Sequence, residues 1–224
     1  MSASGSKIVS TEPLDHKDAR WVTLEKTTYT DPHSTLRTWE SATRLTRPAG
    51  SLIDGVGIVA ILQNGPSPSP SSSSTSSTPS SPSILLQKQF RPPVNAVCIE
   101  VPAGLVDAGE TPEQCALREL KEETGYVGRV AGEGGVGVSP VMFNDPGFCN
   151  TNLNMVHVTV DLSLPENQSP QPQLEDNEFI ECFSVPLTEL YAECRRLEKE
   201  GYAIDARVGT LAEGIEIARQ WKLY

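Results

Sequence analysis

The sequence has no long apolar run and little positive charge. None of its apolar stretches approaches the roughly 20 residues that a membrane-spanning helix needs. The N-terminal stretch MSASGSKIVSTEPLDHKDAR lacks the apolar core of a secretion signal, and its acidic residues are unlike a transit peptide. A net charge of −11 argues against a broad basic surface for nucleic acid or anionic membrane. We therefore expect neither partner, and a location in the cytoplasm with the nucleus as an alternative.

Cysteine is scarce and shows no metal or disulfide pattern. The five cysteines are widely spaced, with no CxxC pair, at Cys98, Cys115, Cys149, Cys182 and Cys194. This spacing favours reduced thiols over a disulfide framework or a zinc site. The chain also lacks a GxSxG motif, so nothing in it predicts a covalent serine intermediate.

The chain divides into three regions by composition. Residues 1–18 are predicted to be a flexible N-terminus, 19–50 a β arm, and 51–224 the main domain. An apolar content of 38% supports a real core. Residues 64–83 are rich in serine and proline, which predicts disorder. Because this stretch joins two strand candidates, we interpret it as an over-long hairpin connection and not as a domain linker.

Periodicity predicts strands interspersed with a few helices. Strand patterns occupy residues 20–30, 36–44, 55–62, 84–90, 96–101, 136–143, 154–162 and 178–185. Helical patterns occupy residues 111–125, 187–200 and 205–222. Such an order is typical of an α/β or α+β domain with a mixed sheet between helices. A two-stranded N-terminal arm has only marginal stability when isolated in water, so we expect it to pack against a partner surface.

The first helix has clear boundaries. Thr111 is a good N-cap, Gln114 completes a capping box, and Pro112 suits the first helical position. Gly125 suits the left-handed position that ends a helix. The apolar stripe expected to pack on the sheet consists of Ala116, Leu117 and Leu120.

Three glutamates, Glu119, Glu122 and Glu123, lie off that stripe within one turn of the helix. Like charges three and four residues apart are neighbours and repel weakly. The preceding loop, residues 100–110, contains glycines that let backbone carbonyls approach a ligand. Mg²⁺ prefers carboxylate and carbonyl oxygens and commonly bridges to substrate phosphates. From spacing alone, a magnesium platform and a solvated acidic face remain equally open.

The stretch GLVDAGETPEQCALRELKEETGY, residues 104–126, resembles the signature of the Nudix hydrolases. It departs from the pattern only at Tyr126, where an aliphatic residue is usual. The matching positions are Gly104, Glu110, Arg118, Glu119, Leu120, Glu122, Glu123 and Gly125. The resemblance implies a Nudix fold and metal-dependent hydrolysis of a nucleoside diphosphate linked to another group.

The same resemblance implies a role for each charged position. Glu119 and Glu123, with the backbone carbonyl of Ala103, would be the main metal ligands. Glu122 would bind a further ion or order the attacking water, and Arg118 would orient the glutamates. Roughly two or three Mg²⁺ ions, for which Mn²⁺ can substitute, would neutralise the carboxylates. Structural roles in the motif fall to Gly104, Glu110, Arg118 and Gly125.

A second similarity, to the ADP-ribose pyrophosphatase and ADP-sugar diphosphatase branch, covers residues 19–62 and 84–221. It is carried by WVTLEKTTY, RTWES, QFRPP, EVPAGL and DPGFCN. It implies a homodimer with exchanged N-terminal strands. Trp21 and Trp39 would sandwich an adenine, with Trp21 supplied by the partner subunit. Glu40 would contact the adenine edge or the dimer seam.

This branch also implies the remaining site residues. Arg44 and Arg91 would hold phosphate or terminal-ribose oxygens, and Asp145 would face the terminal ribose. Glu100 would act as an auxiliary acid beside the metals. Glu178 matches a loop glutamate that activates water, and Glu122 is the second choice. The register in this loop stays open because other acids lie nearby, at Glu175, Asp176 and Glu181.

The sequence therefore predicts hydrolysis of ADP-ribose to AMP and ribose 5-phosphate. One alternative is another nucleoside diphosphate substrate, such as NADH, ADP-glucose or an oxidised guanine nucleotide. The other is a non-catalytic ADP-ribose sensor on the same fold.

Overall fold

The computed structural model describes residues 5–64, 81–132 and 135–223. Most of the serine- and proline-rich stretch that we predicted to be disordered, residues 65–80, lies outside the described residues. In chain order the strands and α-helices are β1 (Val22–Thr30), β2 (Leu36–Arg44), β3 (Gly55–Gln63), β4 (Ser83–Arg91), β5 (Ala96–Glu100), β6 (Ala103–Leu105), α1 (Pro112–Thr124), β7 (Arg129–Val130), β8 (Met142–Phe143), β9 (Asn152–Asp161), β10 (Ile180–Pro186), α2 (Leu190–Lys199), β11 (Ala203–Ile204) and α3 (Ala206–Gln220). Short 3₁₀ turns occur at His16–Asp18, Pro165–Asn167 and Leu187–Glu189.

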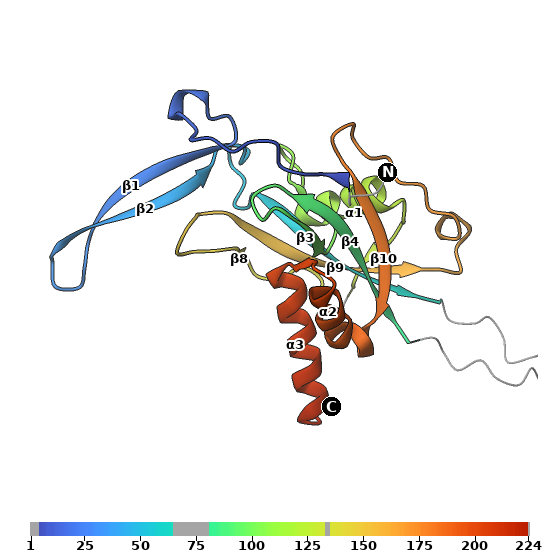
Figure 1. The fold of residues 1–224 in the computed structure, drawn as a ribbon. Coiled ribbons are helices and arrows are strands. Elements are labelled where there is room, and N and C mark those ends of the chain that lie inside the picture. The colour runs from blue at the N-terminus through green and yellow to red at the C-terminus, as the bar shows by residue number, and fades with distance from the viewer. Residues whose placement is uncertain (1–4, 65–80, 133–134, 224) are drawn as a thin grey trace, which may run out of the picture.

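The main domain is built on a mixed sheet. Its principal strand order is β11-β5-β4-β3-β9-β7, with β10 beside β4, β6 beside β3 and β8 beside β9. The pairs β3–β9 and β11–β5 are parallel, and the other pairs are antiparallel. Helix α1 covers one face, and α2 and α3 lie against the other (Figure 1). The predicted mixed sheet between helices is confirmed.

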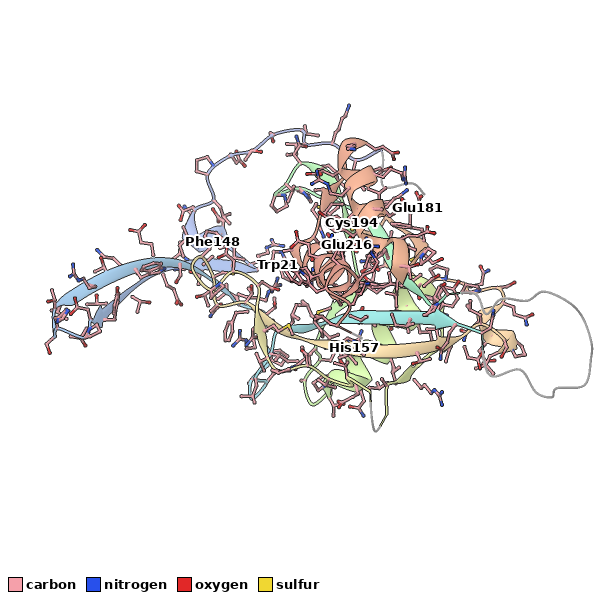
Figure 2. All side chains as sticks on the ribbon, turned by 90° about the horizontal axis from the view of Figure 1, so that it is seen from below. Trp21, Phe148, His157, Glu181, Cys194 and Glu216 are labelled. Carbon is pink, nitrogen blue, oxygen red and sulfur yellow. The ribbon has the colours of Figure 1, made fainter. Side chains whose placement is uncertain are left out.

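The N-terminal arm is a separate two-stranded ribbon. Strands β1 and β2 pair antiparallel over their full length and project away from the sheet (Figure 1). The apolar side chains of Leu24 and Leu36 are 79% and 72% exposed. At the base of the ribbon, where Figure 2 shows Trp21 and Phe148, the N–H of Ala42 donates to the carbonyl of Phe148 at 2.9 Å. The half of the ribbon nearer the body therefore contacts the loop around Phe148, including a bond from Nε1 of Trp39 to the carbonyl of Gly147 at 3.0 Å.

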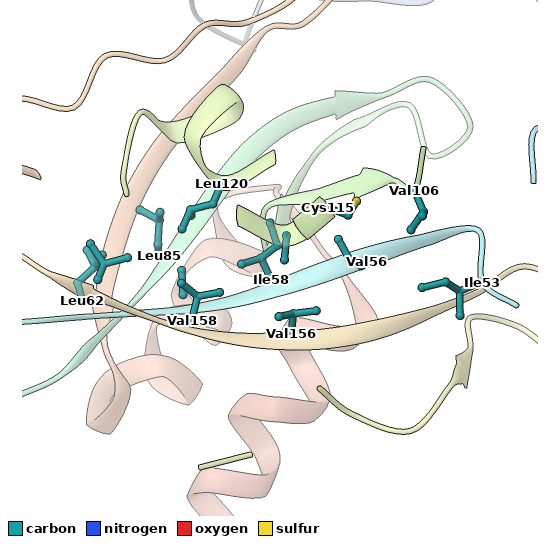
Figure 3. Packing of buried hydrophobic residues seen from close by; sticks show 13 residues of the cluster. Ile53, Val56, Ile58, Leu62, Leu85, Val106, Cys115, Leu120, Val156 and Val158 are labelled. Atoms are coloured by element: carbon teal, nitrogen blue, oxygen red, sulfur yellow. The ribbon is translucent and has the colours of Figure 1, made fainter. Parts of the chain in front are cut away.

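The core is divided by the pleat of the sheet. Successive residues of a strand point to opposite faces, and along β3 Ile58 faces α1 whereas Val59 faces α2 and α3. The cluster under α1 is drawn in Figure 3 and includes Leu120 of the helix and Val156 of β9. Burial on both faces explains why β3 is almost continuously apolar in sequence.

Strands β3 and β4 diverge. They pair only at Ile61–Ile84 and Leu62–Ser83, directly beside the long connection between them. This antiparallel pairing agrees with the interpretation of the connection as a hairpin. At its other end, from Gly55 to Gly57, β3 pairs with β6 instead. Under α1, the strands β3 and β4 are therefore no longer hydrogen-bonded to each other.

The sequence signals at the ends of α1 predicted its boundaries, but the strand pattern over residues 136–143 did not predict the structure of that segment. The Thr111–Gln114 capping box and the left-handed Gly125, at φ 76°, are confirmed at the ends of α1. The strand predicted over 136–143 is wrong for most of its length. Only Met142–Phe143 forms a strand, with one isolated bridge at Val138. Proline lacks the N–H that a ladder needs, and Pro140 lies inside this segment.

Two further findings concern thiols and membranes. All five cysteines are free thiols. Within the described residues, no helix is both long enough and apolar enough to cross a bilayer.

We expect Leu120→Ala to lower the free energy of unfolding by about 2–5 kcal/mol, because the substitution leaves a cavity in a fully buried cluster. Chemical denaturation measures this change. The matched control is Leu52→Ala, since Leu52 is 82% exposed, and it should change stability by less than about 0.5 kcal/mol. Equal effects of the two substitutions would contradict the assignment of Leu120 to the core.

Candidate functional site

The backbone of β6 and helix α1 approach each other closely at one glycine. A Cβ atom built on Gly104 would lie 1.9 Å from Cδ and 2.0 Å from Oε1 of Glu119. Only glycine leaves room for that carboxylate to lie against the strand. The motif glycine therefore sets how near Glu119 comes to the β6 backbone.

Arg118 connects the acidic residues of the motif. Its Nε and Nη2 donate to the two oxygens of Glu110, both at 2.9 Å. Its Nη1 donates to Glu119 at 2.8 Å and to Glu122 at 3.2 Å, and its Nη2 also reaches the carbonyl of Leu105 at 3.1 Å. The bond from Arg118 lowers the pKa of Glu110. One guanidinium thus holds three carboxylates, which supports an orienting role for Arg118.

Glu123 is the most deeply buried acid of the cluster, with 4% of the residue exposed. Its Oε2 accepts a hydrogen bond from the N–H of Ala103 at 2.9 Å. Burial raises the pKa of Glu123 to about 8; the Ala103 N–H opposes this rise, while the charges of Glu119 and Glu178 add to it. Burial likewise raises the pKa of Glu119. The protein environment alone therefore disfavours the charged form of both groups.

The donor set fits a hard cation. Mg²⁺ takes carboxylate and carbonyl oxygens, and a nearby positive charge would favour the ionised forms that burial disfavours. The described residues contain no group of three acidic, histidine or cysteine side chains already arranged to hold a metal. Arg118 instead holds Glu119 and Glu122, and Glu123 turns to the N–H of Ala103. Ligation by the Ala103 carbonyl stays a prediction.

A cavity of about 1420 Å³ lies between β6 and α3. The α1 glutamates do not line it, but it reaches Ala103 and Gly104, which lie against Glu123 and Glu119. Three predicted substrate residues line it, Arg44, Arg91 and Glu100, together with Ala103 and Gly104 of β6. The Nε and Nη2 atoms of Arg91 donate to the two oxygens of Glu100, both at 2.7 Å. Because Glu100 is 3% exposed, this pair fixes the Arg91 guanidinium on the cavity wall.

The loop before β10 brings one acid to the cluster. The charge of Glu178 raises the pKa values of both Glu119 and Glu123, so its side chain lies within electrostatic reach of them. Glu181 instead pairs with Lys88 at 3.4 Å, and Lys88 lies over the rings of Phe183 and Tyr202 in the core under α2 and α3. Of the nearby acids, this electrostatic coupling favours Glu178, whose Oε2 accepts a hydrogen bond from the N–H of Glu175 at 3.0 Å. Glu175 and Asp176 are exposed loop residues.

Four predicted substrate residues do not line the cavity of their own chain: Trp21, Trp39, Glu40 and Asp145. Trp21 is 67% exposed at the base of the ribbon (Figure 2). The Nε1 of Trp39 donates to the carbonyl of Gly147 at 3.0 Å, and Trp39 is still 52% exposed. Both rings are available to a second molecule.

One ion pair on the cavity wall, Asp205–Arg207, is not among the predicted site residues. Arg207, at the start of α3, donates from Nε and Nη2 to the two oxygens of Asp205, both at 2.8 Å. Burial raises the pKa of Asp205, but the hydrogen bonds and charge of Arg207, together with the charge of Arg91, lower it below its usual value. The only sequence signal was an aspartate suited to an N-cap, and Asp205 does cap α3.

Comparison with known proteins identifies relatives over nearly the whole chain. A NUDIX domain model matches residues 76–208. The chain is 52% identical to the ADP-ribose pyrophosphatase of Saccharomyces cerevisiae over 92% of its own length and 81% of that protein. It is 44% identical to an uncharacterized Nudix hydrolase of Schizosaccharomyces pombe, covering 93% and 92% of the two chains. It is 38% identical to the ADP-sugar pyrophosphatase of Mus musculus, covering 92% and 86%.

We predict that Glu123 makes the metal-free protein less stable as pH rises. A carboxyl whose folded pKa is raised contributes stability below its unfolded pKa, and this contribution is lost as pH climbs to the folded value of about 8. In EDTA, the Tm of wild type should therefore fall relative to that of Glu123→Gln between about pH 5 and pH 8.5. Scanning calorimetry at matched pH measures the difference. A constant difference across this range would contradict the burial of an ionisable Glu123.

Proposed function

The chain belongs to the Nudix family, and from this premise we propose that it is a hydrolase of the diphosphate in ADP-ribose and related ADP-sugars. ADP-ribose would yield AMP and ribose 5-phosphate. The observation that carries the proposal is the α1 carboxylate cluster beside a cavity lined by Arg44 and Arg91. The names of the yeast and mouse relatives support the choice of substrate.

Glu119, Glu122 and Glu123, with the carbonyl of Ala103, are the residues that would hold Mg²⁺. The proposal includes roughly two or three ions, with Mn²⁺ as a substitute. When bound, the cation neutralises phosphate charge and lowers the pKa of a water molecule. The fit of a cation to this site rests on the buried carboxylates of Glu119 and Glu123. A bound cation would supply the positive charge that favours their ionised forms.

The chain's own residues would position and deprotonate the reactants. Glu178 is the preferred acceptor of the proton from water, supported by its proximity to Glu119 and Glu123. Glu122 is the second candidate, because it is the more exposed acid on the same turn of α1. No covalent protein intermediate is required, since water attacks phosphorus directly.

Two arginines are suited to the phosphates. A planar guanidinium can bind phosphate oxygens through two parallel hydrogen bonds. Arg91 is held on the cavity wall by the buried Glu100, which supports a positioning role for that acid beside its proposed auxiliary role. Arg44 lines the same cavity from β2. Asp145 remains the residue proposed to face the terminal ribose.

The adenine would lie between Trp21 and Trp39, with Glu40 at its edge or at the dimer seam. An aromatic platform suits any base, because every base presents a π face. Both tryptophans are exposed and neither lines the cavity of its own chain. We therefore propose a homodimer with exchanged N-terminal strands, in which Trp21 completes the site of the partner subunit.

The shape of the arm supports this assembly. A two-stranded ribbon is marginal alone in water, and the apolar side chains of Leu24 and Leu36 are largely exposed on it. A second subunit would cover them. Neither nucleic acid nor membrane is a proposed partner, and the cytoplasm is the proposed location, with the nucleus as the alternative.

The first test is product analysis with ADP-ribose and Mg²⁺. We expect AMP and ribose 5-phosphate, lost in EDTA and reduced at least 100-fold in Glu123→Gln, since one carboxylate ligand is removed. Gly104→Ala should retain its Tm but lose most activity, because the new methyl group displaces the flexible end of Glu119. Gly132→Ala is the matched control, since nothing lies within 4 Å of its added Cβ.

The outcomes of this test separate the alternatives. Turnover of NADH, ADP-glucose or an oxidised guanine nucleotide in preference to ADP-ribose would replace the substrate and retain the reaction. Tight binding of ADP-ribose without either product would instead support the sensor.

The exchanged dimer predicts complementation between two inactive variants. In a heterodimer of Trp21→Ala and Glu119→Gln chains, the Trp21→Ala chain keeps its glutamates and receives an intact Trp21 from its partner. Random assembly should therefore restore roughly a quarter of wild-type activity, because half the dimers are mixed and each has one complete site. Co-expression with two affinity tags isolates the mixture. If activity stays at the level of the two homodimers, Trp21 acts within its own chain.

A further inference from the structure

Gln87 is a fully buried polar residue whose amide has no partner. Its exposure is 0%, and neither Nε2 nor Oε1 makes a hydrogen bond within the described part of the chain. An unpaired amide in the interior costs its full desolvation penalty, so a native protein rarely retains one without a reason. The motif that identifies the family does not include this position.

The strand register places Gln87 under the carboxylate cluster. It lies opposite Glu100 of β5 on one side and Cys182 of β10 on the other. Directly opposite residues of an antiparallel pair point to the same face. The Sγ of Cys182 lies 3.7 Å from the carbonyl oxygen of Glu123. Gln87 is thus located between the C-terminal end of α1 and the Arg91–Glu100 pair.

The divergence of β3 and β4 leaves the Gln87 amide beside the site. Leu85, two residues earlier on the same face, still packs in the apolar cluster under α1. Beyond the Ile61–Ile84 pair, β3 no longer accompanies β4. Burial raises the pKa of Glu123, whereas the Ala103 N–H and the Gln87 side chain lower it. The strand register and this effect on the pKa of Glu123 together place the amide beside the carboxylate, although neither of its polar atoms has the distance and angle of a hydrogen bond.

We propose that Gln87 is a positioning residue of the metal site, which orients the Glu123 carboxylate with its Nε2 group and offers Oε1 to a water molecule held there. Ala103 already occupies Oε2 of Glu123 from the β6 side. Gln87 approaches from β4, so the two donors together would fix the plane of the carboxylate. This inference rests on the proposed metal-dependent function and adds a residue to it.

The test replaces the amide by an apolar group of similar shape. Gln87→Met removes both polar atoms and keeps an unbranched side chain. In EDTA, its Tm should equal or exceed that of wild type, because an unpaired buried group is lost. Calorimetric titration should show Mn²⁺ binding about 10- to 100-fold weaker, as is usual when a residue supporting a metal ligand is removed. Gln89→Met, on the same face of β4 and partly exposed, is the matched control and should leave both readings unchanged.

A second variant keeps the side-chain amide at position 87 but shortens the side chain by one methylene. Gln87→Asn should also weaken Mn²⁺ binding, because its amide withdraws from Glu123 by one methylene. Hydrolysis of ADP-ribose by both variants should fall at low Mg²⁺ and recover partly at high Mg²⁺, with KM for ADP-ribose nearly unchanged.

The outcomes separate this inference from the proposed reaction. A lower Tm with unchanged Mn²⁺ affinity in both variants would make Gln87 a structural residue and overturn the inference, whatever the activity. If wild type releases no AMP while both variants weaken Mn²⁺ binding, the proposed reaction fails and the role of Gln87 stands.

Discussion

Glu123 carries its carboxylate into the interior at the end of α1, where burial raises its pKa to about 8, and its neighbours are arranged around that unfavourable charge. The Glu123 carboxylate has room in the interior because β3 and β4 separate after two paired positions. Beyond that point β6, and not β4, pairs with β3. The first N–H of β6, from Ala103, then points at the carboxylate. Burial disfavours the ionised form of Glu123, and the single hydrogen bond from Ala103 offsets this only in part, so a hard cation would find a carboxylate that still lacks a charged partner.

Arg118 offsets the repulsion among the other carboxylates of the motif. Its guanidinium is about one third exposed and divides its donors among Glu110, Glu119 and Glu122. It therefore reduces repulsion within one helical turn without a hydrogen bond to the buried Glu123. Because Glu110 takes two of its hydrogen bonds, Arg118 would stay anchored to the loop before α1 if Glu119 and Glu122 held the proposed cation.

Much of this could be predicted from sequence because the signals were local. The α1 caps, the strand β3 and the glutamate spacing each depend on residues within a few positions of one another. The predicted roles of Glu119, Glu123 and Arg118 stay predictions, although the contacts agree with them. The position of Gln87 beside Glu123 could not be found in this way, because it depends on strands that are distant in sequence. The Asp205–Arg207 pair is itself local, but its place on the cavity wall depends on how α3 packs against the sheet. The error at 136–143 arose from apolar residues whose ladder Pro140 interrupts.

The arm shows why one chain does not account for the whole proposed site. Arg44, near the end of β2, lines the cavity, whereas Trp39 on the same strand bonds to the Gly147 carbonyl outside it. A strand that advances about 3.3 Å per residue carries successive side chains away from the cavity rather than around it. In the proposed site, the second aromatic face, Trp21, would therefore come from the ribbon of another subunit. The exposed Trp21 and the apolar side chains beside it have the composition of such a ribbon, and a two-fold axis would supply one to each site.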